Sequence, residues 1–241
     1  MNKIAVIGCG FVGGTIADAL ENAGNDVVRI DPKYNDNKLE HFVDKIDGAV
    51  ICLPTPTIDG EQDITLIDKT VIALRDVPTL IKSTILPNML EVYEENVVYS
   101  PEFLREAHAE KDYQNNRNVI WGGDRSHIDW WINRLEVEDR NNMIMNRKDA
   151  SVVKYVYNCF LATKVAVFHE IYSKLDSSFN YHNIINTLSE FENIGPSHMK
   201  ANKLGYDGSC FPKDMEAFAN WLDSEILKNV IKVNNDLIGA R

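Results

Sequence analysis

The segment GYDGSCFPKD, residues 205–214, places a cysteine, a lysine and an aspartate close together near the carboxyl end of the chain. A thiolate is the nucleophile when a cysteine acts in covalent catalysis. The glycines of the segment allow its backbone to approach a ligand, and Lys213 is near enough in sequence to stabilise a thiolate at Cys210. Asp214 is placed to orient a water molecule or a lysine. The segment predicts a nucleophilic cysteine, with a purely structural cysteine as the alternative.

A structural role fits Cys52, in an apolar strand-like run, and Cys159, in an apolar helical pattern, better than it fits Cys210. The four cysteines contain no Cys-x-x-Cys pair, so we expect no metal site, and a zinc site in particular is improbable. The first residues show no signal-peptide pattern, and no apolar run is long enough to span a membrane. We therefore expect a cytoplasmic protein with free thiols and no membrane partner.

Two further pairs of polar residues have the i, i+4 spacing of a helix face. Lys154 and Asn158 interrupt the largely apolar segment 151–175, where a lysine is costly to bury without a partner. They are candidates for a cation and an amide directed at a polar ligand, unless the lysine reaches solvent past a buried stem. Glu102 and Glu106 would share a helix face, but spacing alone favours a solvated acidic helix start over a functional pair.

The chain begins with a strand, a glycine turn and a helix, and the turn Gly8–Gly13 reads GCGFVG. In this pattern Gly8 makes the tight turn, Gly10 lets the backbone approach a pyrophosphate, and Gly13 lets helix and strand pack closely. Asp31 ends the second strand, 21 residues after Gly10 (31 − 10), where its carboxylate would bind ribose hydroxyls and repel a 2′-phosphate. The pattern predicts an NAD site, with a glycine turn that binds nothing as the alternative.

Two polar loops, residues 54–57 (PTPT) and 83–84 (ST), each follow a run typical of a buried strand. Ligands of open α/β sheets bind at the carboxyl ends of the strands. We therefore expect both loops near the cofactor, although ordinary loop chemistry would give the same pattern.

Strand-like and helix-like segments alternate up to about residue 146, and after that the strand signals stop. Strands are expected at residues 3–8, 26–31, 49–53, 79–82, 97–99, 118–121 and 143–145, and helices at 11–23, 64–74 and 87–95. Further helices are expected at 151–175, 181–191, 215–222 and 224–237. This order predicts an α/β fold: a Rossmann-type doubly wound parallel sheet followed by an all-α domain. We expect the NAD-binding domain at residues 1–147 and a helical domain with the cysteine loop at 148–241.

The composition excludes some functions and leaves others open. A net charge of −11 and a hydrophobic content of 44% indicate a globular chain with few clustered cations. Nucleic acid is therefore not an expected partner, because phosphate binding needs clustered lysine and arginine. A small anionic substrate remains compatible, since local charge decides its binding.

Six segments in this order resemble the UDP-glucose/GDP-mannose dehydrogenase family, and its UDP-glucose 6-dehydrogenase branch in particular. They are GCGFVG, LPTPT, STILPN, SPEFLRE, KYVYNCFLATKVAVFHE and GSCFPKD, from Gly8 to about Asp214. The resemblance implies two NAD-linked oxidations of the C6 alcohol of a nucleotide sugar, which yield the uronate. Cys210 would attack the C6 aldehyde, the adduct would lose a second hydride to give a thioester, and water would hydrolyse it.

The resemblance also implies a role for each matching residue. Lys154 and Asn158 would stabilise the oxyanion, Asp214 and Thr84 would position the water, and Glu106 would be the general base. The candidate cofactor contacts are Gly8, Gly10, Phe11, Val12, Gly13, Asp31, Pro54, Thr55, Ser83, Thr84, Glu106 and Lys213. The candidate substrate contacts are Glu102, Phe103, Leu104, Lys154, Asn158, Gly205 and Gly208.

The chain departs from the family pattern in several places. Asp207 takes a glycine position, Ala107 replaces a glycine, and Asn193 stands where an arginine is common. Family members also carry a further nucleotide-sugar-binding domain, for which 241 residues leave no room, so we expect that domain to be lacking. These departures concern substrate specificity more than the oxidation chemistry.

Two other functions remain open from the sequence. A two-electron NAD-dependent hydroxy-acid dehydrogenase shares the architecture and does not need Cys210. A non-catalytic module that binds NAD or a nucleotide sugar is the second. In all three cases the apolar segment 151–175 fits a packing role, and the resemblance implies a homodimer formed through the helical domain.

Overall fold

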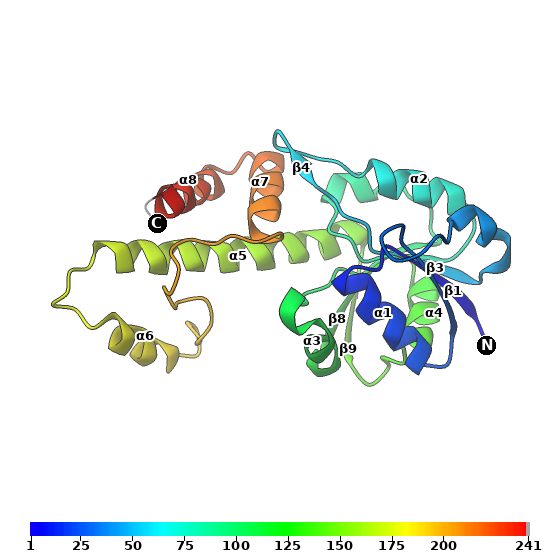
Figure 1. Ribbon diagram of the computed structural model, residues 1–241, viewed down its shortest axis with the longest axis horizontal. Coiled ribbons are helices and arrows are strands. Elements are labelled where there is room, and N and C mark those ends of the chain that lie inside the picture. The colour runs from blue at the N-terminus through cyan, green and yellow to red at the C-terminus, as the bar shows by residue number, and fades with distance from the viewer. Residues whose placement is uncertain (240–241) are drawn as a thin grey trace. The chain divides into compact units, whose positions relative to one another are not determined.

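The computed structural model describes residues 1–239, and their contacts divide the chain into two compact units (Figure 1). Unit 1 comprises residues 1–56 and 62–154, and unit 2 comprises residues 57–61 and the chain from residue 155 onward. The expected domain boundary after residue 147 lies where the long helix α5 (Arg147–Lys174) begins. The contacts instead divide the chain inside that helix, between Lys154 and Tyr155.

Unit 1 is built on a seven-stranded sheet of order β2-β1-β3-β6-β7-β8-β9. Its strands are β1 (Lys3–Ile7), β2 (Asp26–Ile30), β3 (Gly48–Ile51), β6 (Thr79–Ile81), β7 (Val97–Tyr99), β8 (Asn118–Gly122) and β9 (Asn141–Met145). The first five in this order run parallel, which confirms the doubly wound α/β fold. β8 runs antiparallel to β7, and β9 runs parallel to β8. An antiparallel neighbour needs no crossover, so the connection from β7 to β8 stays at the carboxyl end of β7.

Successive residues of the central strands point to opposite faces of the sheet, and each face has its own core. One core joins Ile4, Val6, Val50 and Leu80 to helices α1 (Phe11–Asn22) and α4 (Arg125–Leu135). The other joins Ala5, Ile7, Ile51 and Ile81 to helix α2 (Thr65–Leu74). Figure 1 shows α1 and α4 on one side of these strands and α2 on the other. The expected covering of both faces is confirmed.

Some elements of unit 1 were not expected from the sequence. They are the helices α3 (Ala109–Asn115) and α4, the short 3₁₀ helices η1 (Leu39–His41), η2 (Val43–Lys45) and η4 (Glu106–His108), and the hairpin of β4 (Thr57–Ile58) and β5 (Glu61–Gln62), whose first strand belongs to unit 2. The start of α4 had a readable signal, because the Asp124 side chain caps it by accepting hydrogen bonds from the amides of Ser126 and His127.

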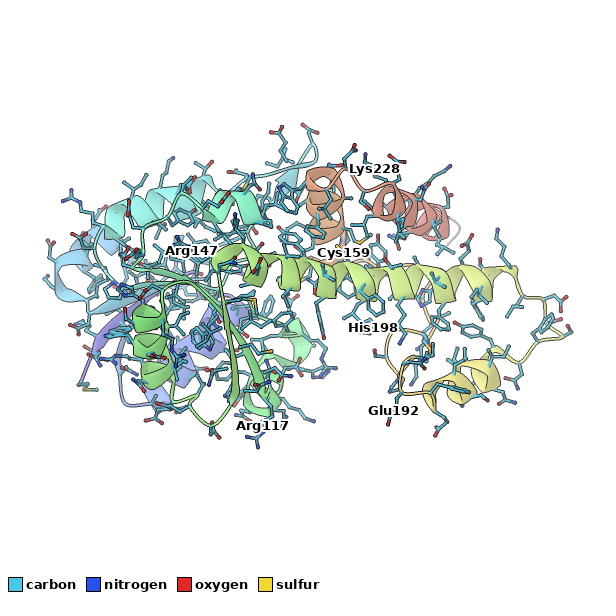
Figure 2. The ribbon with its side chains drawn as sticks, turned by 180° about the vertical axis from the view of Figure 1, so that it is seen from behind. Arg117, Arg147, Cys159, Glu192, His198 and Lys228 are labelled. Atoms are coloured by element: carbon cyan, nitrogen blue, oxygen red, sulfur yellow. The ribbon has the colours of Figure 1, made fainter. Side chains whose placement is uncertain are left out.

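The helix expected at residues 87–95 is wrong, since only the 3₁₀ helix η3 (Pro87–Leu90) forms there. The remainder is held by tertiary hydrogen bonds. The Tyr93 hydroxyl donates to Asp68 at 2.6 Å, and the Arg147 guanidinium, labelled in Figure 2, donates to the carbonyl oxygens of Tyr93 and Glu94 at 2.6 and 2.7 Å. These contacts hold the segment as a turn against the sheet.

Unit 2 consists of the later part of α5 with α6 (Tyr181–Ser189), α7 (Phe211–Trp221) and α8 (Glu225–Gly239). Tyr155 of α5 stacks on Phe218 of α7 with ring centroids 4.9 Å apart. The Tyr181 hydroxyl of α6 donates to the carbonyl oxygens of Phe168 and Met199 at 2.9 and 2.7 Å. All four expected helices of this half therefore exist. Within residues 1–239, no helix combines the length and the apolar character needed to cross a membrane.

Candidate active site

Each glycine of the first turn in unit 1 has a physical reason to be a glycine. Gly8 adopts φ +85°, and a Cβ there would lie 2.5 Å from the Cys52 carbonyl oxygen. A Cβ on Gly13 would collide with the carbonyl oxygen of Gly8, so α1 packs directly on the turn. A Cβ on Gly10 would meet no atom within 4 Å, which leaves the backbone at the start of α1 accessible. This is the shape that a pyrophosphate requires, with the helix dipole and free amide groups aimed at it.

The helix start itself is suited to an anion. Gly10 is the N-cap residue of α1 and makes no side-chain cap bond, and the first turn contains no acidic residue. Phe11 and Val12, the first helical residues, are partly buried. The structure therefore leaves the amino end of α1 without a competing negative charge in that turn.

Asp31 follows β2 and connects the glycine turn to that strand. Its carboxylate accepts hydrogen bonds from the amides of Cys9 and Lys33 at 2.7 and 2.8 Å. An acceptor is thus fixed beside the glycine turn, where the sequence analysis expects the ribose.

The two polar loops after β3 and β6 lie side by side, because these strands are parallel neighbours. The Thr55 hydroxyl donates to the Thr84 carbonyl oxygen at 2.8 Å, and the Ser83 hydroxyl donates to the Leu53 carbonyl oxygen at 2.6 Å. Pro54, Thr55, Ser83 and Thr84 therefore belong to one rigid rim at the carboxyl ends of the strands.

Glu102 and Glu106 do not share a helix face, which corrects the alternative of a common acidic helix start. Glu106 is exposed and begins η4, whereas Glu102 precedes it in an irregular segment after β7. The Glu102 side chain is only 9% exposed and forms an ion pair with Lys82, at 2.5 Å between Oε1 and Nζ. Phe103 and Leu104, the other expected substrate contacts of this loop, are partly buried.

Lys82 is a residue that the sequence analysis treated only as the end of a buried strand. It follows β6, is 4% exposed, and its Nζ also donates to the Ser100 hydroxyl at 3.0 Å. The sequence could have indicated the role of Lys82, because a lysine at the end of the apolar run TLIK must find a partner when it is buried.

Lys154 is buried in unit 1, so the alternative of an ammonium that reaches solvent is wrong. The side chain is held by the substrate-loop candidates: Nζ donates to the Glu102 carbonyl oxygen at 2.6 Å and lies 4.8 Å from the centroid of the Phe103 ring. The lysine is therefore fixed in place by the loop that carries the two glutamates.

Cys210 is exposed in unit 2 and occupies the N-cap position of α7. The Asp214 amide donates to the Cys210 carbonyl oxygen at 2.9 Å, so the loop turns into a helix at the cysteine. The amino end of α7 places the partial positive charge of the helix beside this residue. An accessible sulfur at a helix start is the environment in which reactive cysteines are found.

Asp214 lies in the first turn of α7 and is 1% exposed. One carboxylate oxygen accepts from the Asn158 amide at 2.6 Å, and the other pairs with the Lys213 ammonium, also at 2.6 Å. The carboxylate thereby fixes the orientation of the Asn158 side chain. Asn158 itself is 5% exposed. Lys213 neutralises the buried carboxylate.

The glycines of the cysteine loop differ in what surrounds them. Gly205 adopts φ +71° and packs against Asn234 of α8, whose side chain makes two hydrogen bonds to the backbone of Tyr206. A Cβ on Gly208, at φ +88°, would meet no atom within 4 Å. Gly205 therefore has a packing reason to be glycine, while Gly208 leaves open space beside the loop.

The other thiols are in less reactive surroundings. Burial raises the pKa of Cys52, and burial with the nearby Asp214 carboxylate raises the pKa of Cys159, labelled in Figure 2, to about 12. Burial and Asp31 raise the pKa of Cys9. A thiol with a raised pKa forms little thiolate at neutral pH.

Comparison with known proteins identifies relatives of this chain. Residues 148–236 match the profile of the UDP-glucose/GDP-mannose dehydrogenase family, central domain. Residues 148–236 belong to the UDP-glucose/GDP-mannose dehydrogenase family, as its central domain. The chain is 26% identical to the UDP-glucose 6-dehydrogenase of Rickettsia bellii, over 97% of this chain and 67% of that protein.

Solved structures agree with this membership. A UDP-glucose dehydrogenase from Pyrobaculum islandicum superposes with a TM-score of 0.86 at 25% identity, over 98% of this chain and 68% of that one. A 3-hydroxyisobutyrate dehydrogenase from Mycobacterium tuberculosis superposes with a TM-score of 0.77 at 16% identity, over 99% of this chain and 94% of that one. The second likeness shows a shared fold only.

The segment of this chain that matches other relatives spans less than half of their length. Among three further UDP-glucose 6-dehydrogenases, from Bacillus subtilis, Rickettsia prowazekii and Rickettsia typhi, it spans 41%, 49% and 49% of their length.

Proposed function

We propose that the chain carries out the NAD-dependent four-electron oxidation of a nucleotide-sugar C6 alcohol to the uronate, with UDP-glucose as the substrate and UDP-glucuronate as the product. The observation that carries the proposal is the exposed Cys210 at the amino end of α7, one helical turn before the buried Asp214. The glycine turn Gly8–Gly13 and Asp31 support NAD as the cofactor. NAD supplies the acceptor for each of the two hydrides.

The reaction consists of two oxidations and a hydrolysis. In the first, the C6 carbon loses a hydride and its hydroxyl loses a proton to Glu106, which gives the aldehyde. The Cys210 thiolate then forms a bond to C6, and the carbonyl electron pair moves onto oxygen. Loss of a second hydride from C6 turns this thiohemiacetal into a thioester. Water adds to the thioester, the C–S bond breaks, and the carboxylate, the thiolate and two protons are released.

The charge that develops on the C6 oxygen requires fixed donors. Lys154 supplies an ammonium whose position the Glu102 carbonyl and the Phe103 ring define, and Asn158 supplies an amide that Asp214 orients. Asp214 and Thr84 are the groups that position the hydrolytic water in this proposal. Because each donor is held by contacts within its own unit before the reaction, little reorganisation of that donor opposes the transition state.

The test is a panel of nucleotide sugars incubated with NAD, with NADH and product both quantified. The proposal predicts two NADH per UDP-glucose consumed and the accumulation of UDP-glucuronate. One NADH per substrate, with a small hydroxy acid as the preferred substrate, would instead support the hydroxy-acid dehydrogenase alternative. Binding of UDP-glucose without any NADH formation would support a non-catalytic module.

Cofactor choice gives a prediction of its own. The Asp31 carboxylate beside the glycine turn would face the additional phosphate of NADP, and juxtaposed like charges cost several kcal/mol. We expect kcat/KM to favour NAD over NADP by about 100-fold. Asp31→Asn keeps an acceptor for a backbone amide but removes the charge, so it should narrow this ratio. Steady-state kinetics with both cofactors measure it, and comparable turnover of wild type with both would remove Asp31 from this role.

A homodimer formed through unit 2 is part of the proposal. Val156, Phe160, Val167 and Ile171 of α5 are between 45% and 66% exposed. Their spacing of 4, 7 and 4 residues places them in one stripe along the helix, as in helices that pack against a partner helix. Exposed apolar stripes of this kind are typical of protein–protein contacts.

The dimer prediction is tested by light scattering after size-exclusion chromatography. Phe160→Glu puts a charge in the centre of the stripe, and we expect it to shift the protein from dimer to monomer, because an unpaired buried charge costs several kcal/mol. Ile72→Glu, at a position of α2 in unit 1 that is 73% exposed, is the matched control and should leave the mass unchanged. A wild-type monomer at micromolar concentration would contradict the proposal.

A further inference from the structure

The ion pair between Lys82 and Glu102 is nearly inaccessible to solvent. The side chains are 2% and 9% exposed, and Lys82 Nζ also lies 5.6 Å from the centroid of the Trp121 ring. A cavity of about 10 Å³ beside the pair has room for about one water molecule. Bulk water therefore does not solvate these charges.

Stability alone does not account for such a pair. Replacing a buried ion pair by apolar residues of similar size is often neutral or stabilising, because the lost hydration of both charges offsets their attraction. Lys82 follows β6 and Glu102 lies in the segment after β7, beside a sheet whose core positions are apolar. The pair must therefore provide something other than net folding free energy, and geometry is the remaining candidate.

The contacts of Glu102 indicate which geometry depends on the pair. Its carboxylate is held by Lys82, and its carbonyl oxygen accepts from Lys154 at 2.6 Å. The next residue, Phe103, places its ring 4.8 Å from the Lys154 ammonium. Lys82 in turn is fixed by Ser100, which directly follows β7. A continuous series of contacts thus leads from the strand ends through Glu102 to Lys154.

We propose that Lys82 is a positioning residue: it anchors the Glu102 side chain, and through the Glu102 backbone and the Phe103 ring it fixes the Lys154 ammonium for the reaction. This inference rests on the proposed function, in which Lys154 stabilises the C6 oxyanion. Lys82 itself does not contact the substrate. Its removal allows the loop of residues 101–105 to move and displaces Lys154.

The kinetic test is a double-mutant cycle with Lys82→Met and Glu102→Gln, measured on folded protein. A misplacement of about 1 Å in a catalytic group costs on the order of 100-fold, so Lys82→Met should lower kcat/KM for the nucleotide sugar by about that factor. In the Glu102→Gln background the same change should alter kcat/KM by less than about 3-fold, because residues that act through each other are not additive. The Kd for NAD should not change in any variant.

Folding must be separated from positioning. Each single variant leaves one buried charge without its partner, whereas the double variant is neutral, so the double variant should regain thermal stability. A purely structural role predicts that activity returns together with stability, and that result would overturn the proposal.

If Lys82→Met does not fold, the comparison of Glu102→Gln with the double variant replaces it. The proposal then predicts that both have the same lowered kcat/KM. Lys148→Met, which breaks the exposed Lys148–Glu91 pair at 2.7 Å, is the matched control and should retain wild-type kinetics.

A second measurement needs no substrate and separates this inference from the proposed function. The Arg105 amide donates to Asp112 at 2.9 Å, so its hydrogen exchange reports on the loop. Exchange in residues 101–106 should be at least about tenfold faster in Lys82→Met and in the double variant, because local opening becomes easier. Unchanged exchange would overturn the anchoring role even in an active enzyme. If the wild type oxidises no nucleotide sugar but Lys82→Met still exchanges faster than wild type in residues 101–106, the proposed function is overturned and the anchoring role stands.

Discussion

Replacing Cys210 with alanine is expected to lower uronate formation by on the order of 10³-fold or more, the loss typical of removing a catalytic nucleophile. The aldehyde cannot lose a hydride in a second oxidation until a nucleophile has added to its carbonyl carbon. A thiolate adds at neutral pH, whereas a serine hydroxyl needs a strong base. The first oxidation does not need the sulfur, so slow redox chemistry on added alcohol or aldehyde should persist. Quantifying UDP-glucuronate and NADH separately measures both effects.

Cys210→Ser extends this prediction. Its oxygen should form an ester in place of the thioester, and an ester hydrolyses more slowly. Protein that carries a covalent sugar adduct should therefore accumulate and be visible by intact-protein mass spectrometry. Cys52 and Cys159, whose thiols have raised pKa values, serve as internal controls in alkylation experiments, because the exposed Cys210 should react faster than either. Wild-type uronate production by Cys210→Ala would refute the thioester mechanism.

The second large effect is expected at the glycine turn. Gly13→Ala places a Cβ against the Gly8 carbonyl oxygen, a backbone atom that cannot rotate away, so α1 must shift from the turn. We expect a loss of about 1–3 kcal/mol in the free energy of unfolding, as for other overpacked sites. NAD binding should weaken with it, because the amide groups at the start of α1 move. Denaturant unfolding and an NAD titration measure the two effects.

The adjacent glycine provides the control. A Cβ on Gly14 would lie 3.8 Å from the Cys9 carbonyl oxygen, which is an ordinary contact. Since alanine is favoured over glycine inside a helix by about 1 kcal/mol, Gly14→Ala should be neutral or stabilising and should retain NAD binding. If Gly13→Ala unfolds and binds NAD like Gly14→Ala, then close packing of α1 on the turn is not what makes Gly13 necessary.

The sequence predicted features that depend on neighbouring residues. The glycine turn is readable because a left-handed φ and a close helix–strand contact each demand the missing Cβ at a definite position. The alternation of short apolar runs with helical patterns predicted the sheet and its two covered faces, since both periodicities are local. These properties involve few distant contacts, so the local sequence is enough to predict them.

Tertiary structure decided what depends on partners far away in the chain. Residues 91–95 do not form a helix, and Tyr93 is held instead by contacts with the distant Asp68 and Arg147. The reversal of β8 keeps the Glu102 loop at the carboxyl ends of the strands, which no local pattern encodes. Lys82 meets Glu102, and Asn158 meets Asp214, across 20 and 56 residues of sequence (102 − 82 and 214 − 158). Burial makes an unpaired charge too costly. The sequence by itself therefore determined that these polar residues need partners, and only the folded chain decided which partners they have.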